Sequence, residues 1–183
     1  RQEEIISKEL AIAPDLVPIF ETLLHARRDI LARIAALDSR IRAIAKRHAT
    51  VRLLMTAPGV GPITAMAVVA AFDDAARFRR SSSAGAYLGL TPKRYESGEI
   101  SRNGRVSKRG DRFTRKCLFE AANAIFCRKL GGSRLRNWAK TVADRTGPRK
   151  AKVALARKLA VTLHAMWSTN TPVSYTHLTL PTS

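Results

Sequence analysis

The chain has 183 residues and a formal net charge of +19, with 33 Lys and Arg residues against 14 Asp and Glu. Hydrophobic residues make up 45% of it, which allows a packed core and argues against wholesale disorder. Because so large a positive excess repels itself in a folded domain, it indicates a polyanionic partner, and nucleic acid is the first candidate. No long apolar run or lipidation signal points to a membrane, although charge alone leaves a generic basic protein, such as a ribosomal one, as an alternative.

The first predicted element is a long helix in residues 1–48. Apolar residues recur at intervals of three or four over about four heptads, as in a coiled-coil seam. The seam consists of Leu16, Ile19, Leu23, Ala26, Ile30, Ile34, Leu37, Ile41 and Ile44. Pro18 falls in the first turn, where its missing N–H is tolerated. Two interpretations stay open: an arm that pairs with another chain or with a missing upstream region, and an amphipathic helix packed on its own domain.

A Gly-hydrophobic-Gly turn follows in residues 58–62 (PGVGP). We predict that a short helix ends at Pro58-Gly59 and that a second helix runs from Pro62 to about Phe72, which is the helix-hairpin-helix pattern. Gly59 and Gly61 would adopt positive φ and approach a phosphate closely, while the free N–H groups of the second helix favour an anion. The pattern is typical of sequence-independent contact with a nucleic-acid backbone, and a plain helical turn is the alternative.

No metal ligands are predicted. Asp73 and Asp74 form a tempting pair, but no third carboxylate follows at a matching spacing, so we interpret them as helix caps. Cys117 and Cys127 belong to no Cys/His cluster with zinc spacing. Residues 81–83 (SSS) are expected to cap a helix that continues to Leu90.

Residues 89–111 (GLTPKRYESGEISRNGRVSKRGD) are rich in Gly, Ser and Asn, which predicts a loop or a short β-hairpin. Residues 93–116 hold nine cations and three anions, an excess of nine minus three, or six. Such a segment is a credible phosphate cradle. The predicted nucleic-acid-binding residues are Gly59, Gly61, Lys93, Arg94, Arg102, Arg105, Lys108 and Arg109. Ser97 lies in a Ser-Gly pair, a common turn sequence, and its hydroxyl would need activation to act as a nucleophile.

Three further helices are predicted, from Phe113 to Leu130, from Leu135 to Ala143 and from Arg149 to about Trp167. The fold class is therefore mainly α: a helix-hairpin-helix core, a short β-hairpin or loop with the serine, and the long N-terminal coiled-coil-like helix. We expect an arm at 1–48 and a domain at 49–170. Residues 171–183 (TPVSYTHLTLPTS) contain no Lys, Arg, Asp or Glu, and we interpret this tail as non-native.

The runs APGVGPITAMAVVAAF and FRRSSSAGAYLGLTPKRYESGEISRNGRVSKRGD resemble the transposase domain of the IS one-ten family of insertion sequences and the related IS eleven-eleven group. Three features occur in the family's order: the Pro-Gly-Val-Gly turn, the Tyr-Leu-Gly-Leu-Thr-Pro segment, and Ser-Gly followed by Ser-Lys-Arg-Gly-Asp. The resemblance covers roughly residues 50–168. The upstream helix fits the family's coiled-coil linker.

The resemblance implies an RNA-guided DNA recombinase. Family members join a RuvC-like domain, whose four acidic residues hold magnesium, to a domain that supplies a nucleophilic serine. Ser97 matches that serine, which would attack a DNA phosphodiester and form a phosphoserine link. The chain would then be an enzyme fragment that binds no cofactor and is inactive alone, while the full-length protein uses Mg²⁺. The implied partners are DNA, a non-coding guide RNA and further copies of the chain, in a bacterial, cytoplasmic and nucleoid-associated setting.

Other readings stay open. Ser101, Ser107 and Tyr95 are rival nucleophiles in the same segment. A non-catalytic helix-hairpin-helix module that binds the DNA or RNA backbone would explain the charge without any chemistry. A third possibility is an RNA-binding or structural basic protein, although the aromatic content of 6% argues against base stacking on single strands.

Overall fold

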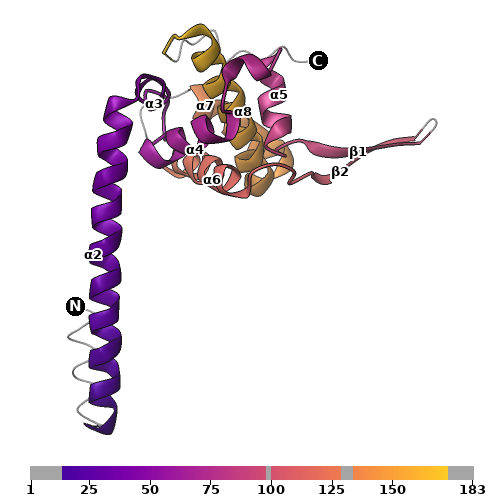
Figure 1. The fold of residues 1–183 in the computed structure, drawn as a ribbon. Coiled ribbons are helices and arrows are strands. Elements are labelled where there is room, and N and C mark those ends of the chain that lie inside the picture. The colour runs from indigo at the N-terminus through magenta and orange to yellow at the C-terminus, as the bar shows by residue number, and fades with distance from the viewer. Residues whose placement is uncertain (1–13, 98–99, 129–133, 173–183) are drawn as a thin grey trace. The chain divides into compact units, whose positions relative to one another are not determined.

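The computed structural model describes residues 14–97, 100–128 and 134–172, without the side chains of residues 14, 94–97, 100–103 and 105. The described chain is mainly helical, as predicted (Figure 1), and it divides into two compact units, Arg1–Ala43 and Ile44–Ser183. Its elements are η1 (a 3₁₀ turn, Pro14–Leu16), α2 (Val17–Arg47), α3 (Ala49–Leu54), α4 (Pro62–Phe72), η2 (Ala75–Arg77), α5 (Ser81–Tyr87), β1 (Pro92–Ser97), β2 (Ile100–Val106), α6 (Arg112–Cys127), α7 (Arg134–Thr146) and α8 (Pro148–Thr169).

The predicted arm is a single continuous helix, α2, of 31 residues. Pro18 lies in its first turn, as expected, because the first N–H groups of a helix have no internal partner. Side chains of the predicted seam are largely exposed, with Leu23 60%, Ile30 57% and Leu37 56% accessible. The described residues of the first unit therefore leave this apolar stripe exposed, and the pairing of the stripe stays a prediction.

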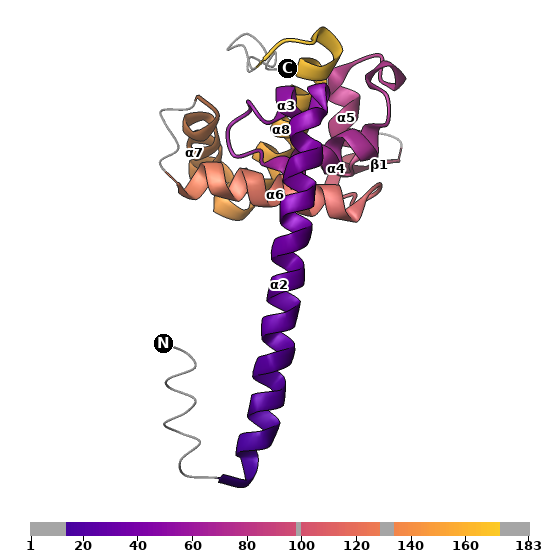
Figure 2. The ribbon, with the colours of Figure 1, turned by 60° about the vertical axis from the view of Figure 1, so that its left-hand side comes forward.

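The second unit is built around α8, which packs against α3, α5, α6, α7 and η2 (Figures 1 and 2). This helix contains no acidic residue, and its middle is apolar on nearly every side. Leu155, Leu159 and Leu163 are fully buried in it, together with residues from each of the helices around it. A helix that is apolar all round is expected at the centre of a domain, because each of its faces needs an apolar neighbour.

A buried histidine joins α8 to the segment between α4 and α5. The Nε2 of His164 donates to the carbonyl oxygen of Ala75 at 2.9 Å, and its Nδ1 lies 3.0 Å from Ser81 Oγ. The ring also meets Phe72 and Phe78 edge to face. Because both ring nitrogens are bonded, the imidazole is satisfied in place and acts as a structural connection.

Two predicted helix ends and one predicted cap are wrong. The first helix of the glycine turn ends at Leu54, well before Gly59, and the chain makes two turns before α4 begins. Helix α5 ends at Tyr87, where the chain turns toward β1. The serines at 81–83 do not cap α5: the N-cap is Arg80, without a side-chain cap bond, and Ser81 is bonded to His164 instead.

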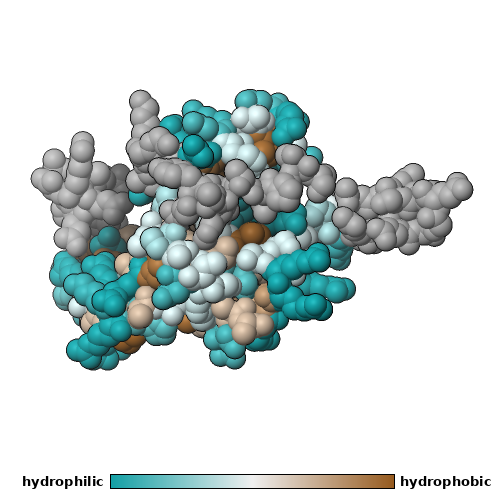
Figure 3. Space-filling model, turned by 90° about the horizontal axis from the view of Figure 1, so that it is seen from above, coloured by the Kyte–Doolittle hydropathy of each residue, from teal (hydrophilic) through white to brown (hydrophobic). Residues whose placement is uncertain are grey.

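The remaining helices occupy the predicted segments with shifted ends. Helix α6 ends at Cys127, and Arg128 is its extended C-cap, so the predicted end at Leu130 is wrong. On the face shown in Figure 3, hydrophilic residues cover most of the described surface and hydrophobic ones form only small separate patches. None of the described helices combines the length and the apolar character that a membrane crossing requires.

Candidate nucleic-acid interface

The basic segment is a β-hairpin, which resolves the choice between hairpin and loop. Strands β1 and β2 are antiparallel, and Figure 1 shows them extending outward from the helices of their unit. Tyr95 pairs with Arg102, and Ser97 pairs with Ile100. Ser97 is therefore the last residue of its strand. The side chains of Ser97, Arg94, Arg102 and Arg105 lie outside the described residues, so their predicted roles stay predictions.

Two glycines allow the two ends of the hairpin to pack closely against each other. Gly89 has φ +67° and Gly110 has φ +77°, values that L side chains rarely adopt. A Cβ on Gly89 would collide with the backbone of Arg109, and one on Gly110 would collide with the carbonyl oxygen of Tyr87. The amide of Lys108 also donates to Gly89 O at 3.1 Å. The Tyr-Leu-Gly-Leu-Thr-Pro segment and the Ser-Lys-Arg-Gly-Asp segment thus pack against each other at the base of the hairpin. We call this contact between residues 87–91 and 107–111 the joint.

Arg115 of α6 connects the two sides of this joint through hydrogen bonds. Its Nη1 donates to the carbonyl oxygens of Leu88 at 3.2 Å, Arg109 at 2.6 Å and Gly110 at 3.1 Å. Hydrogen bonds from a charged donor are stronger than neutral ones, and these three connect both sides of the joint to α6. From sequence alone Arg115 contributes only to the positive excess of residues 93–116, because nothing in its sequence context separates a carbonyl-binding arginine from a phosphate-binding one.

Helix α6 is itself fixed at the hairpin. Asp111 is its N-cap and accepts from the amide of Thr114 at 2.6 Å. Hydrogen bonds from Thr114 hold the pKa of the Asp111 carboxyl below its usual value, and the Arg115 charge adds a smaller contribution. The buried Thr114 hydroxyl donates to the carbonyl oxygen of Ala67 in α4 at 3.0 Å. The start of α6 is therefore tied both to the hairpin base and to α4.

Three of the predicted nucleic-acid-binding cations lie on the surface at this base. Lys93, Lys108 and Arg109 are exposed, and none of them pairs with a carboxylate within the part of the chain that the structure describes. Lys108 also adopts φ +56°, a left-handed conformation that is uncommon for a residue with a side chain. These charges are available to a polyanion without first breaking an ion pair.

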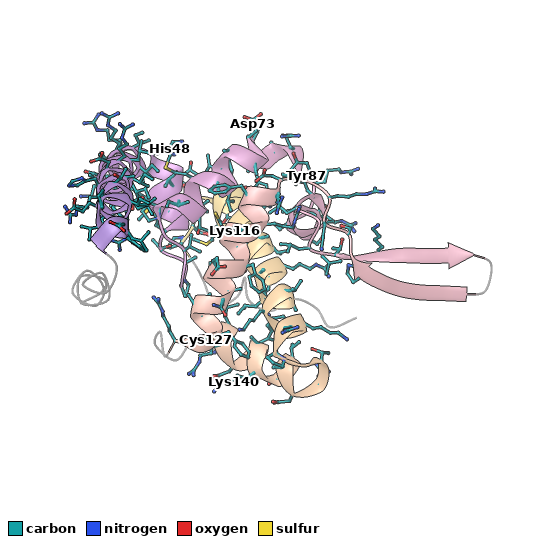
Figure 4. The ribbon with its side chains drawn as sticks, turned by 90° about the horizontal axis from the view of Figure 1, so that it is seen from below. His48, Asp73, Tyr87, Lys116, Cys127 and Lys140 are labelled. Atoms are coloured by element: carbon teal, nitrogen blue, oxygen red, sulfur yellow. The ribbon has the colours of Figure 1, made fainter. Side chains whose placement is uncertain are left out.

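An exposed aromatic residue that the sequence patterns did not single out contributes its backbone to the same joint, where its carbonyl oxygen lies against Gly110. Tyr87 is 40% exposed, at the root of the hairpin in Figure 4. Its ring meets Phe78 edge to face at 5.3 Å between centroids, and the guanidinium carbon of Arg77 lies 5.7 Å from the Tyr87 centroid. Arg77 Nη1 donates to the carbonyl oxygen of Phe72 at 3.2 Å.

The glycine turn between α3 and α4 differs from its prediction. Gly59 has the expected positive φ of +74°, but its close approach is to α6: a Cβ there would lie 2.8 Å from Ile125 Cγ1. Gly61 has φ −95°, so the positive φ predicted for it is wrong. It is the N-cap of α4, and a Cβ on it would meet nothing within 4 Å. The open start of α4 could still receive a phosphate, and the helix-hairpin-helix function stays a prediction.

The paired aspartates act as helix ends, as predicted. Asp74 caps η2 by accepting from the amide of Ala76 at 2.8 Å, and Asp73 is the C-cap of α4 with φ +63°. Within the described ranges, no cluster of three or more His, Cys, Asp or Glu side chains could hold a metal ion.

Comparison with known proteins finds relatives that are named as transposases. Residues 51–140 match the Transposase IS116/IS110/IS902 family. The chain is 34% identical over 174 residues to a protein of Pseudomonas aeruginosa named "Probable family 20 transposase". This match covers 92% of the chain and 51% of the relative. It is 28% identical over 163 residues to the transposase for insertion sequence element IS1111A of Coxiella burnetii, covering 88% and 45%. For the IS1328 transposase of Yersinia enterocolitica, identity is 30% over 157 residues, covering 85% and 47%. The chain spans about half the length of these relatives.

Proposed function

Because this chain belongs to the IS116/IS110/IS902 family of transposases, we propose that it is the serine-bearing half of a DNA transposase, with Ser97 as the nucleophile. The observation that supports this role most directly is the position of Ser97 at the end of a strand, in a hairpin that extends from the helical domain. A nucleophile at such an end can approach a phosphorus atom in DNA without a clash between the helices and the duplex. The cations Lys93, Lys108 and Arg109 at the hairpin base, which form no ion pair among the described residues, supply the attraction for a polyanion.

The proposed step is a transesterification. The Ser97 hydroxyl oxygen attacks a DNA phosphorus, its proton passes to a base or to water, and the bond from phosphorus to the leaving deoxyribose oxygen breaks. That oxygen takes up a proton and becomes a free hydroxyl. Energy is conserved in the phosphoserine ester, so a hydroxyl of a second strand can attack the same phosphorus and release Ser97. Arginine positions 94, 102 and 105 on the two strands would stabilise the charge on the non-bridging oxygens.

Among the described residues, no group of three or more His, Cys, Asp and Glu side chains could hold a metal ion. In our proposal, the metal-binding carboxylates belong to a RuvC-like domain of the full-length transposase. We also propose a non-coding guide RNA as a partner, and pairing of the α2 stripe with a further copy of the chain. The exposed side chains of that stripe support the pairing, since exposed apolar seams of this length are typical of helices that associate.

The direct test is a search for the covalent intermediate. Full-length transposase that contains this sequence is incubated with its element-end DNA and Mg²⁺, digested with protease and nuclease, and analysed by mass spectrometry. We expect a nucleotide phosphate on the peptide that holds Ser97, and its loss in Ser97→Ala. The matched variants Ser101→Ala, Ser107→Ala and Tyr95→Phe should keep the adduct on the same residue. An adduct on any of these three, or unchanged recombination by Ser97→Ala, would overturn the assignment and favour a non-catalytic backbone-binding module.

A second test uses the 183-residue chain alone. We expect it to bind DNA with strong salt dependence and to leave supercoiled plasmid intact, because the activating groups are supplied elsewhere. Nicking of the plasmid by the isolated chain in EDTA would contradict the proposed division of labour.

A further inference from the structure

We propose that Arg77 and Tyr87, together with Lys108 and Arg109, form a preorganised site for a DNA backbone phosphate at the base of the hairpin. This inference deepens the proposed function, because it rests on DNA being the substrate. It assigns a binding role to two residues that lie outside the sequence-predicted set. It also separates the place where DNA is held from the place where it is cut.

The first argument is the geometry of the Arg77–Tyr87 pair. The guanidinium of Arg77 lies over the Tyr87 ring, and one of its nitrogens is fixed on the carbonyl oxygen of Phe72. A guanidinium has five N–H donors, so several remain for a ligand. The Tyr87 ring is held in turn by Phe78, which contacts the buried His164. Both side chains are therefore positioned before a ligand arrives, and this lowers the entropic cost of binding.

The second argument is the chemistry of the exposed atoms. No hydrogen bond of the Tyr87 hydroxyl is formed with any residue in the described ranges, and the ring is 40% exposed. One face of that ring is covered by a guanidinium and another side by Phe78, which leaves little room for a stacked base. A tyrosine hydroxyl and an arginine are both common donors to phosphate oxygens. The pair thus fits a phosphodiester better than a nucleobase.

The third argument is the local charge. Neither residues 75–95 nor residues 100–110 contain an Asp or Glu. The carbonyl oxygen of Tyr87 is packed on Gly110, so the Lys108–Arg109 turn lies beside Tyr87 through a joint that Arg115 stabilises. The nearest carboxylates in sequence are at helix ends. Asp111 accepts from the amide of Thr114, and Asp74, three residues before Arg77, accepts from the amide of Ala76, while Asp73 is the C-cap of α4. The charge that an incoming phosphate meets at the hairpin base is therefore mainly positive.

The site cannot hold the phosphate that Ser97 attacks. From Pro92 to Ser97 the strand advances five residues, which corresponds to about 17 Å at about 3.3 Å per residue. The major groove of DNA can accept a two-stranded ribbon and is about 12 Å wide. The length of β1 exceeds this width. The base and the end of β1 would therefore contact different phosphates, with the hairpin between them.

The test is binding of the 183-residue chain to a short, mixed-sequence, fluorescein-labelled DNA duplex, followed by anisotropy at several NaCl concentrations. For Arg77→Gln we expect weaker binding, and the negative slope of log K against log salt should become shallower by about 0.9, because one phosphate contact is lost. For Tyr87→Phe, which keeps the ring packed against Phe78, we expect affinity to fall about tenfold with an unchanged slope, because only a neutral donor is removed.

The matched control is Lys140→Gln, an exposed cation on α7 that Figure 4 shows far from Tyr87 in the same unit. It should leave both affinity and slope close to wild type. Equal losses in Lys140→Gln and Arg77→Gln would mean diffuse attraction and would overturn the site, as would wild-type binding by Tyr87→Phe. An RNA duplex of the same sequence serves as the second probe. A loss confined to RNA would overturn the assignment to DNA.

Failure of this inference is distinct from failure of the proposed function. If the Arg77 and Tyr87 variants bind DNA normally while full-length protein still forms the Ser97 adduct, only the phosphate site at the hairpin base is wrong. If the variants lose binding as expected but no adduct forms on Ser97, the phosphate site at the hairpin base is supported and the assignment of Ser97 as the nucleophile is wrong.

Discussion

The helical body and the hairpin of the second unit are stabilised by different means. In the body, α8 buries an apolar middle against α3, α5, α6 and α7, and side chains such as Leu155 and Leu159 are inaccessible to solvent. The hairpin has two strands and no third strand among the described residues. Isolated two-stranded hairpins are marginally stable in water. Its order must therefore come from the joint at its base, where Gly89, Gly110 and Arg115 meet.

This difference separates stability from function. Nonpolar burial in the body supplies most of the free energy of folding, while the joint uses backbone contacts and a charged donor to direct the hairpin. Substitutions in the body should unfold the whole unit. Substitutions in the joint should release the hairpin and weaken DNA binding by more than their effect on global stability.

The largest expected effect is in the body. Leu159→Ala leaves a cavity in α8 and should lower the free energy of unfolding by about 4 kcal/mol, as buried Leu→Ala changes do. The control is Ile63→Ala on α4, where the side chain is 43% exposed, and we expect a loss below about 1 kcal/mol. Urea unfolding monitored by circular dichroism measures both. Similar losses for the two variants would show that α8 is not the centre of the core.

The next effect is at the joint. Gly110→Ala places a Cβ against the Tyr87 carbonyl at a positive φ, and we expect a loss of about 3 kcal/mol from strain and overpacking together. Gly61→Ala is the comparison, because Gly61 has negative φ and open space around it. Its change should stay below about 1 kcal/mol. DNA binding should also fall in Gly110→Ala, and a tolerated Gly110→Ala would contradict the role of Gly110 in the joint.

A smaller effect is expected for Arg115→Lys. One ammonium cannot reproduce the guanidinium contact with three carbonyl oxygens, so we expect a loss of about 2 kcal/mol, within the range for charged hydrogen bonds. Hydrogen exchange should accelerate at the amides of Ser107 and Lys108, which pair with Thr91 and Gly89. Arg112→Lys, on the exposed side of the same helix, should leave both amides protected. Unchanged exchange in Arg115→Lys would remove Arg115 from the joint.

The smallest expected effect is the cap of α6. Asp111→Ala should cost about 1 kcal/mol, whereas Asp111→Asn keeps an acceptor for Thr114 and should cost less. Because the pKa of Asp111 is lower in the folded chain, the unfolded chain takes up the proton first as pH falls. The contribution of ionised Asp111 to the free energy of unfolding is complete above the unfolded-state pKa of about 3.9. It disappears as pH falls through the pKa of the folded chain. Urea unfolding at several acidic pH values should show this decline in wild type and its absence in Asp111→Asn.

Local sequence determined the helical elements and several of their ends. The heptad spacing specified α2, Pro62 marked the start of α4, and Asp74 marked a cap, because helix periodicity and turn chemistry act between neighbours in the chain. The basic character of residues 89–111 was also evident without a fold. The end of α5 was mispredicted, because the chain leaves the helix where Gly89 packs at positive φ against the backbone of Arg109, on the far side of the hairpin.

Tertiary structure decided what the polar and glycine residues do. Gly59 and Gly89 both have positive φ, yet Gly59 accommodates α6 whereas Gly89 accommodates the backbone of Arg109. Arg115 and Arg109 look alike in sequence, but one binds carbonyl oxygens and the other faces solvent. The physical reason is that a side chain's role depends on the atoms around it. Those atoms come from segments that only the folded chain brings together.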